Sequence, residues 1–145
     1  MKIKKIEKKE EIHNFLKLYN ASATRQISDR VGNLEKYSEK LYRYAENFGM
    51  YVDDVVIGFF SFYNNNIKEK KAYLTIIAVK KEYRRMKFGS QAMHFIYLEC
   101  QKKQMEKICL EVDKDNEKAY MFYKKEGFEI LGNASECSIY MQKEI

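Results

Sequence analysis

The chain has 145 residues, 27 basic and 21 acidic side chains, and a formal net charge of +6. A chain of this length can bury an ordinary hydrophobic core, so it needs neither disulfides nor a structural metal to fold. Charges of both signs are interspersed and 14% of the residues are aromatic, which excludes the composition of a disordered chain. Proline is absent, which argues against a linker-rich or multidomain chain. We therefore expect one domain over residues 1–145.

Three features indicate a cytoplasmic location. The longest nearly apolar stretch, residues 55–62, is too short to span a bilayer. The basic N-terminus lacks the apolar region of a signal peptide. Cys100, Cys109 and Cys137 are odd in number and form no CxxC or Cys/His pair, so we expect three reduced thiols in or near the core, no disulfide framework and no metal site.

The basic residues are spread along the chain except at one place. Most of them are lysines, as on a solvated surface, and this distribution does not resemble an arginine-built nucleic-acid groove. Residues 80–87 are the exception, with five basic side chains against one acidic one. Such a cluster suits a small polyphosphate as well as a nucleic acid.

The N-terminal third predicts one strand and two helices. Residues 2–6 alternate polar and apolar, which is typical of a strand. Apolar residues at every third or fourth position over 12–19 predict an amphipathic helix. The polar stretch 20–33 predicts a loop or a short helix, and residues 34–47 predict a second helix that Gly49 ends.

The middle of the chain predicts a hairpin and a buried strand. Two β-prone runs, residues 50–52 and 55–63, flank an acidic corner at Asp53–Asp54. The next turn is expected at residues 64–66. The run 72–79 is almost continuously apolar, which predicts a strand covered on both faces.

The C-terminal half predicts a helix over 88–103, a strand over 107–112, a short helix over 116–125 and closing strands over 128–131 and 138–142. A hairpin-connected meander that passes into one strand–helix–strand crossover requires a mixed sheet. We expect an α/β (α+β) fold, with a mixed, mostly antiparallel central sheet, one parallel βαβ crossover and flanking helices.

The crossover places a basic loop at the start of a helix. The strand over 72–79 runs into the basic residues 80–87, and the helix begins at residue 88. A helix N-terminus presents unpaired N–H groups and a partial positive charge, which together favour phosphate. The loop is therefore a candidate phosphate site.

This loop resembles that of the Gcn5-related N-acetyltransferases. The family carries R/Q-x-x-G-x-G/A between a strand that ends in apolar-x-Val and a helix, and Arg84, Gly89 and residues 77–79 match that pattern. Two positions depart from it, because Lys87 replaces the first loop glycine and Lys81 replaces the usual proline. Lys87 either turns outward or adds a cation against the bound pyrophosphate.

A second segment of the same family follows at the expected distance. Its pattern N-x-x-A-x-x-x-Y-x-x-x-G-F is matched by Asn116, Ala119, Tyr123, Gly127 and Phe128. The order of predicted elements is also that of the family, so the resemblance covers essentially the whole chain and is strongest over residues 72–131. It implies the acyl-coenzyme A N-acyltransferase fold.

The resemblance implies that acetyl-coenzyme A is the cosubstrate, with no metal. An amine attacks the thioester directly in a ternary complex, where the strands over 72–79 and 107–112 separate. Backbone N–H groups near residues 77–79 hold pantetheine and polarise the thioester carbonyl. The residues expected to bind the cosubstrate are Ile77, Ala78, Val79, Arg84, Arg85, Met86, Lys87, Phe88, Gly89, Ser90, Asn116 and Tyr123.

Two side chains are candidates for proton transfer. Tyr123 stands at the family's acid position, where a phenol can donate a hydrogen bond or a proton to the departing sulfur; the alternative is that it only packs in the core. Glu111 stands where family members that acetylate protein N-terminal amines carry a base; the alternative is an exposed strand glutamate. Alternation puts Glu111 on the strand face opposite Leu110 and Val112.

The remaining polar residues are less informative. His13 and His94 are expected to be surface or packed residues, and Thr75 is expected to be structural. Acceptor specificity is expected to come from residues 20–47 and from Asp53–Asp54, whose carboxylates would attract a cationic amine.

We therefore expect an acetyl-coenzyme A-dependent N-acetyltransferase that acts on the primary amine of a small molecule or peptide. The alternative is a catalytically weak acyl-coenzyme A-binding module that works as a sensor or interaction domain, which Lys87 makes conceivable. A nucleic-acid binder is a third hypothesis, which the motifs disfavour. We expect no nucleic-acid or membrane partner, and a monomer or homodimer.

Overall fold

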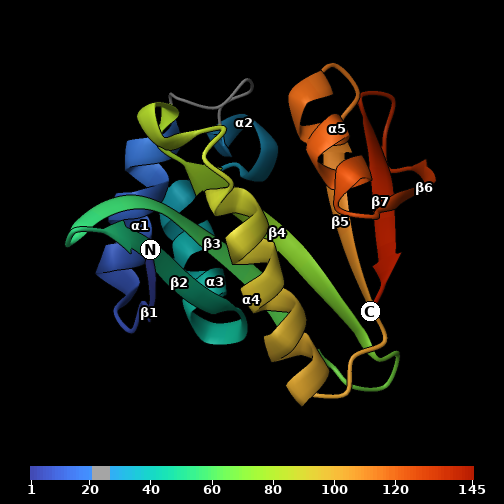
Figure 1. Ribbon diagram of the computed structural model, residues 1–145, viewed down its shortest axis with the longest axis horizontal. Coiled ribbons are helices and arrows are strands. Elements are labelled where there is room, and N and C mark those ends of the chain that lie inside the picture. Colours follow the sequence, from blue (N-terminus) through green and yellow to red (C-terminus); the bar gives the residue numbers. More distant parts are fainter. Residues whose placement is uncertain (21–26) are drawn as a thin grey trace.

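The computed structural model describes residues 1–20 and 27–145. Its centre is a seven-stranded sheet in the order β1-β2-β3-β4-β5-β7-β6 (Figure 1). The strands are β1 (Lys2–Lys5), β2 (Glu46–Val52), β3 (Val55–Asn66), β4 (Lys71–Val79), β5 (Lys107–Asp113), β6 (Glu129–Asn133) and β7 (Ser138–Glu144). The helices are α1 (Lys9–Asn20), α2 (Ile27–Val31), α3 (Leu34–Tyr44), α4 (Phe88–Lys102) and α5 (Glu117–Lys125), and a 3-10 turn spans Lys81–Tyr83.

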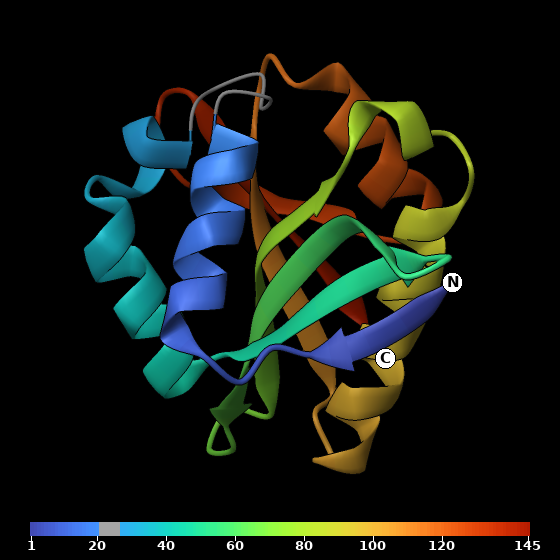
Figure 2. The same cartoon turned by 90° about the vertical axis from the view of Figure 1, so that its left-hand side faces the viewer.

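The predicted mixed sheet is confirmed. β4 and β5 are parallel neighbours joined through α4, and the other neighbouring pairs are antiparallel. Figure 2 shows α1, α2 and α3 on one side of the sheet and α4 on the other. Within the described residues, no helix has the length and apolar character that crossing a membrane requires.

Each face of the sheet carries its own hydrophobic core. One core packs α4 and α5 against the sheet and includes the fully buried Met93 and Ile96. The other packs α1 and α3 against it and includes the fully buried Leu16 and Leu41. Both cores draw residues from β4, so the predicted strand covered on both faces is confirmed.

The second predicted helix ends earlier than its sequence pattern indicates. α3 stops at Tyr44 and β2 follows at once, so the predicted helix through residue 47, ended by Gly49, is wrong. Asn47 gives the physical reason. Its Nδ2 donates to the carbonyl oxygen of Leu41 at 3.0 Å, and its Oδ1 accepts from Ser61 at 2.6 Å. The first bond adds a second donor to a carbonyl that already accepts from the backbone N–H of Ala45, and the second ties the chain to β3.

The predicted hairpin of β2 and β3 is confirmed. Asp53–Asp54 adopts left-handed φ angles of 50° and 63°, as a two-residue turn between twisted strands requires. The next turn, predicted at residues 64–66, is displaced to residues 67–70, because the ladder between β3 and β4 continues to Asn66.

The three cysteines are free thiols. Cys100 and Cys109 are buried as predicted, and burial raises the pKa of Cys100 to about 12. Cys137 is exposed, so the prediction that it lies in or near the core is wrong. It occupies the turn before β7, where its backbone N–H donates to the Ser135 hydroxyl at 3.1 Å.

Candidate active site

The candidate site forms where β4 and β5 separate, which we call the β4–β5 opening. The two strands pair only over residues 71–73 and 107–109, and Figure 1 shows them diverging beyond that point. The register of β4 against β3 shifts at Thr75, which is left as an extra residue. Such a bulge bends its strand and increases its twist. The bulge therefore turns β4 away from β5 and leaves the half-buried residues 77–79 without a partner strand on that side.

A basic loop leaves the end of β4 and leads into α4. The Nε of Arg84 donates to the carbonyl oxygen of Val79 at 3.0 Å, which ties the loop to the strand end. Arg85 and Lys87 both adopt a left-handed φ of 65°. Non-glycine residues carry a cost in this conformation, so the loop holds a shape that its side chains do not favour. Arg84, Arg85, Met86 and Lys87 are exposed.

Lys87 is the N-cap residue of α4. Its side chain makes no capping hydrogen bond, so the N–H groups of the first helical turn, which includes Phe88 and Gly89, have no side-chain acceptor from this residue. An anion placed there would meet these N–H groups together with the charges of the loop. The loop and the first turn of α4 thus present N–H donors and positive charge, and phosphate binding there stays a prediction.

A carboxylate on the other helix holds the start of α4 in place. Ser90 Oγ and Tyr97 Oη each donate to the Glu126 carboxylate at 2.9 Å. Lys143 Nζ donates to the backbone oxygen of Glu126 at 2.6 Å. The Ser90 hydroxyl is therefore engaged with α5, and its backbone N–H is the group that it can offer to a phosphate.

Gly89 allows α4 and α5 to approach closely. A Cβ built on Gly89 would lie 3.1 Å from Cζ of Phe122, closer than most side-chain contacts allow. Asn116 begins α5, and its Oδ1 accepts from the backbone N–H of Ala119 at 3.2 Å. The basic loop and α4 therefore contact the second family segment in two ways. Gly89 packs against Phe122, and Glu126 accepts hydrogen bonds from α4.

Tyr123 is a half-buried phenol on α5. Its ring packs edge-on against Phe122, with centroids 5.2 Å apart, and against Phe128 at 5.6 Å. Burial raises the pKa of Tyr123 to about 12, and the nearby charge of Arg30 lowers it in part. The phenol therefore keeps its proton at neutral pH. Tyr123 packs against the core and also keeps a hydroxyl group that can donate a hydrogen bond. A packing role and a role as hydrogen-bond donor are therefore compatible for this residue.

Glu111 lies on β5 and faces away from the α4 core, as the alternation predicts. Leu110 and Val112 belong to that core, whereas the half-buried Glu111 lines a cavity on the opposite face. Its Oε2 accepts from the Ser138 hydroxyl at 2.6 Å. This bond orients the carboxylate, and Oε1 has no hydrogen bond to a described residue. Glu111 is therefore not the exposed strand glutamate that the alternative interpretation expects.

The cavity that contains Glu111, which we call the tyrosine pocket, has a volume of about 440 Å³. It lies between the sheet and the helices α2 and α3. Its lining residues are Arg30, Val31, Lys36, Tyr37, Lys40, Tyr63, Tyr73, Thr75 and Glu111. The Tyr37 and Thr75 hydroxyls are hydrogen-bonded to each other, so the bulge residue also fixes a wall of this pocket.

Sequence reasoning found only part of the tyrosine pocket. α2 and α3 lie within the predicted acceptor region 20–47, of which residues 21–26 fall outside the described residues. Asp53–Asp54 does not line the pocket, and Figure 2 shows the β2–β3 turn on the far side of the molecule from α2 and α3. His13 and His94 do not line it either. The lining tyrosines and cations had no sequence signal beyond their types, because they are spread over four elements.

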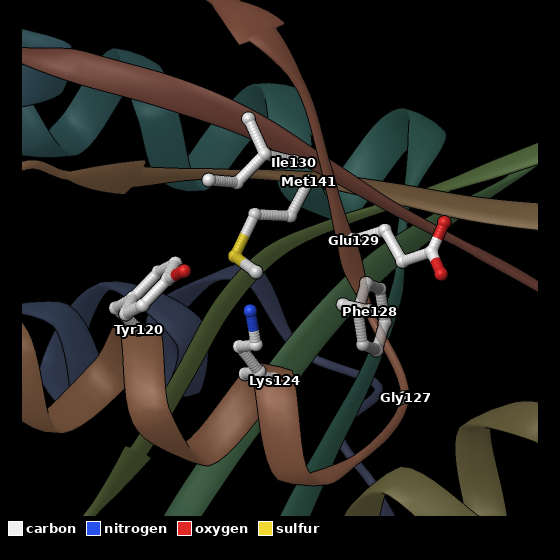
Figure 3. A pocket seen from close by; sticks show the side chains of 7 residues that line it. All are labelled: Tyr120, Lys124, Gly127, Phe128, Glu129, Ile130 and Met141. Carbon is white, nitrogen blue, oxygen red and sulfur yellow. The ribbon is translucent and has the colours of Figure 1, made fainter.

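A second depression lies between α5 and the strands β6 and β7. Figure 3 shows Tyr120 and Lys124 of α5 pointing toward Ile130 and Met141 of the neighbouring strands. None of the predicted catalytic or cosubstrate-binding residues lines it. We therefore place the candidate site at the β4–β5 opening and not here.

The structure has a parallel strand pair that separates beside an uncapped helix N-terminus. This arrangement is that of the acyl-coenzyme A N-acyltransferase fold, which the sequence motifs also imply. The family model described as the acetyltransferase (GNAT) family matches residues 11–128. The chain therefore belongs to the GNAT acetyltransferase family.

Solved structures share this fold. Ard1 from Thermoplasma volcanium has a TM-score of 0.77 at 23% identity, over 99% of this chain and 97% of that one. PaiA N-acetyltransferase from Thermoplasma acidophilum, solved with coenzyme A, has a TM-score of 0.75 at 20% identity over 100% of both chains. The ribosomal-protein-S18-alanine N-acetyltransferase from Escherichia coli has a TM-score of 0.77 at 18% identity, over 99% of this chain and 93% of that one. No curated protein sequence matches the chain.

Proposed function

We propose that this protein is an N-acetyltransferase that moves the acetyl group of acetyl-coenzyme A directly to a primary amine within a ternary complex. The observation that carries the proposal is the β4–β5 opening, which has the uncapped start of α4 at one end and Glu111 on its other face. Family membership and a relative solved with coenzyme A support the same conclusion.

The residues on the α4 side fit acetyl-coenzyme A. Arg84, Arg85 and Lys87 supply positive charge beside the free N–H groups of the first turn of α4, which suits a pyrophosphate. Beyond Tyr73, β4 has no partner on its β5 side, so residues 77–79 can hydrogen-bond an extended amide chain such as pantetheine. The bound thioester supplies an activated acetyl group.

Tyr123 acts in this proposal as a hydrogen-bond donor to the departing sulfur. A thiol like that of cysteine has a pKa near 8.5, roughly 3.5 units below the pKa of about 12 for the buried phenol. Full proton transfer from Tyr123 to the thiolate would therefore be uphill. Donation of a hydrogen bond requires no transfer, and it stabilises negative charge on sulfur as the bond to the acetyl group breaks.

Glu111 accepts the proton that the attacking amine loses. Ser138 holds one carboxylate oxygen, and Oε1 is left to face the tyrosine pocket. An alkylamine with a pKa near 10.4 is only about 0.04% neutral at pH 7, so a nearby carboxylate that takes its proton raises the reactive fraction. The amine therefore enters from the tyrosine pocket, on the opposite side of the opening from the basic loop.

Thiol release from acetyl-coenzyme A over a panel of primary amines tests the proposal. We expect turnover with at least one amine, and a large loss of rate in Tyr123→Phe. Tight binding of acetyl-coenzyme A without turnover on any amine would instead favour the acyl-coenzyme A-binding module. A cytoplasmic location and a monomeric or homodimeric state remain predictions, which cell fractionation and light scattering can check.

A further inference from the structure

We propose that the acceptor is a small primary amine that carries its own anionic group, a carboxylate or a phosphate, within a few bonds of the amine. The inference rests on the proposed function and concerns the charge of the tyrosine pocket. Among the described residues, Arg30, Lys36 and Lys40 line the pocket together with one carboxylate, that of Glu111, so this part of the lining has a net charge of +2.

The two kinds of charge lie in different parts of the pocket. Arg30, Lys36 and Lys40 belong to α2 and α3 and are exposed, so they surround the mouth. Glu111 comes from the sheet and is half-buried, so it lies at the floor beside the β4–β5 opening. A ligand with an amine at one end and an anion at the other matches this order. The amine would reach Glu111 while the anion stays among the cations.

The three cations have no acidic partner in the part of the chain that the structure describes. Across residues 1–20 and 27–145, no carboxylate lies within ion-pair distance of Arg30, Lys36 or Lys40. Lys40 Nζ lies 5.7 Å from the centre of the Tyr63 ring, a contact that leaves its N–H groups free. An incoming anion would therefore meet uncompensated positive charge without displacing an internal partner.

Arg30 is the most central of the three. Its charge lowers the pKa of tyrosines on three different elements, Tyr37 of α3, Tyr73 of β4 and Tyr123 of α5. The guanidinium therefore lies within electrostatic range of both walls of the opening. It can hold a carboxylate or phosphate in a bidentate manner, which a lysine cannot.

The volume of the pocket and the sign of its charge favour a small anionic amine over other acceptors. A cavity of about 440 Å³ falls in the usual range for small-molecule sites. A polyamine or an aminoglycoside would bring several positive charges against the three cations at the mouth, which disfavours both approach and binding. An amine without an anion would leave the three cations unused.

Paired acceptors with and without the anion, compared at equal concentrations of the neutral amine, test the inference. We would compare the kcat/KM of an α-amino acid with that of its amide, phosphoethanolamine with ethanolamine, and an acidic dipeptide with its amidated form, with spermidine as the polycation. We expect the anionic member of at least one pair to be favoured by about 10- to 100-fold, the effect of a charged hydrogen bond. The pair with the largest ratio identifies carboxylate, phosphate or peptide as the source, and added salt should reduce the ratio.

Variants of the lining residues then test whether the tyrosine pocket causes the preference for an anionic acceptor. Arg30→Gln and Lys40→Gln should raise KM for the anionic acceptor by a larger factor than KM for the neutral acceptor, and Arg30→Glu should shift the preference toward spermidine. Lys68→Gln, an exposed lysine in the β3–β4 turn outside the pocket, is the matched control. The inference would be overturned if the wild-type protein turned over the neutral and cationic acceptors as well as or better than the anionic ones. It would also be overturned if none of these variants changed the ratio of kcat/KM between the anionic and the neutral acceptor.

Calorimetric binding of the anionic amines separates this inference from the proposed function. If no amine is acetylated but the anionic amine binds and Arg30→Gln abolishes that binding, then the proposed function fails and the assignment of the ligand's charge stands. If amines are acetylated without any preference for an anion, then the proposed function stands and this inference fails. Thermal melts of each variant establish that it is folded.

Discussion

The two sides of the β4–β5 opening are built in different ways. On the α4 side, the loop and first helical turn over residues 84–90 are consecutive in the chain, and they offer mainly backbone N–H groups and exposed cations. On the other side, the tyrosine pocket collects side chains from α2, α3, β3, β4 and β5. A cosubstrate shared by a family can be bound by a short backbone motif. In the proposed function, recognition of the acceptor depends on side chains that only the folded chain brings together.

The largest expected effect is on the rate of the chemical step, which the proposed function places between the two sides of the opening. Tyr123→Phe should lower kcat by about 100- to 10,000-fold, because the departing sulfur loses its hydrogen-bond donor. KM for acetyl-coenzyme A should change little, since the ring and its packing remain. Steady-state thiol release measures both constants. Tyr120→Phe is the control, because Tyr120 is on the same helix but lines the second depression, between α5 and the strands β6 and β7. A variant at position 123 as active as wild type would assign Tyr123 to packing alone.

A second change acts on the pocket side only. Glu111→Gln should lower kcat/KM for the acceptor by about 100-fold at neutral pH, because the amine loses the group that takes its proton. The loss should shrink as pH rises toward the pKa of the amine, since more of the amine is then already neutral. A pH series of kcat/KM measures this. Glu144→Gln, on the neighbouring β7, is the control, and an unchanged pH profile would remove Glu111 from the role of base.

A third change should affect the α4 side alone. Glu126→Ala removes the acceptor of Ser90 and Tyr97 and should lower the free energy of unfolding by about 2 kcal/mol. Because the start of α4 then loses its tie to α5, KM for acetyl-coenzyme A should rise more than KM for the acceptor. Chemical denaturation and steady-state kinetics measure the two effects. Glu129→Ala, an exposed residue of β6, is the control. An equal rise in both KM values would contradict the separation of the two sides.

The smallest expected effect concerns the departure at Lys87. Lys87→Gly should raise the free energy of unfolding by up to about 1 kcal/mol, because glycine accepts the left-handed backbone without a Cβ penalty. Gln104→Gly, which has a φ of 61° away from the loop, should give a similar gain. Thermal unfolding compares them, and calorimetry measures acetyl-coenzyme A affinity. Weaker binding only in the variant at position 87 would mean that the lysine side chain contacts the cosubstrate.

Much of the α4 side could be predicted from the sequence. Hydrophobic periodicity located β4 and α4, and the spacing of Arg84, Gly89, Asn116 and Tyr123 indicated the family. These signals are local, because each depends on residues within one element or on the chain length between neighbouring elements. Lys87 was recognised as a departure by sequence, but its left-handed backbone is a property of the folded loop.

The tertiary structure decided the remaining features. The end of α3 depends on a hydrogen bond between Asn47 and Ser61, and the β4–β5 opening depends on a bulge at Thr75 that no pattern within β4 reveals. Arg30 and Glu111 are 81 positions apart in the chain, yet both line the tyrosine pocket. The sequence by itself determined which elements form and which cosubstrate motif the chain carries, because short-range sterics, hydrogen bonding and periodicity control both. Only the folded chain decided the charge and lining of the tyrosine pocket, because contacts between distant residues create that surface.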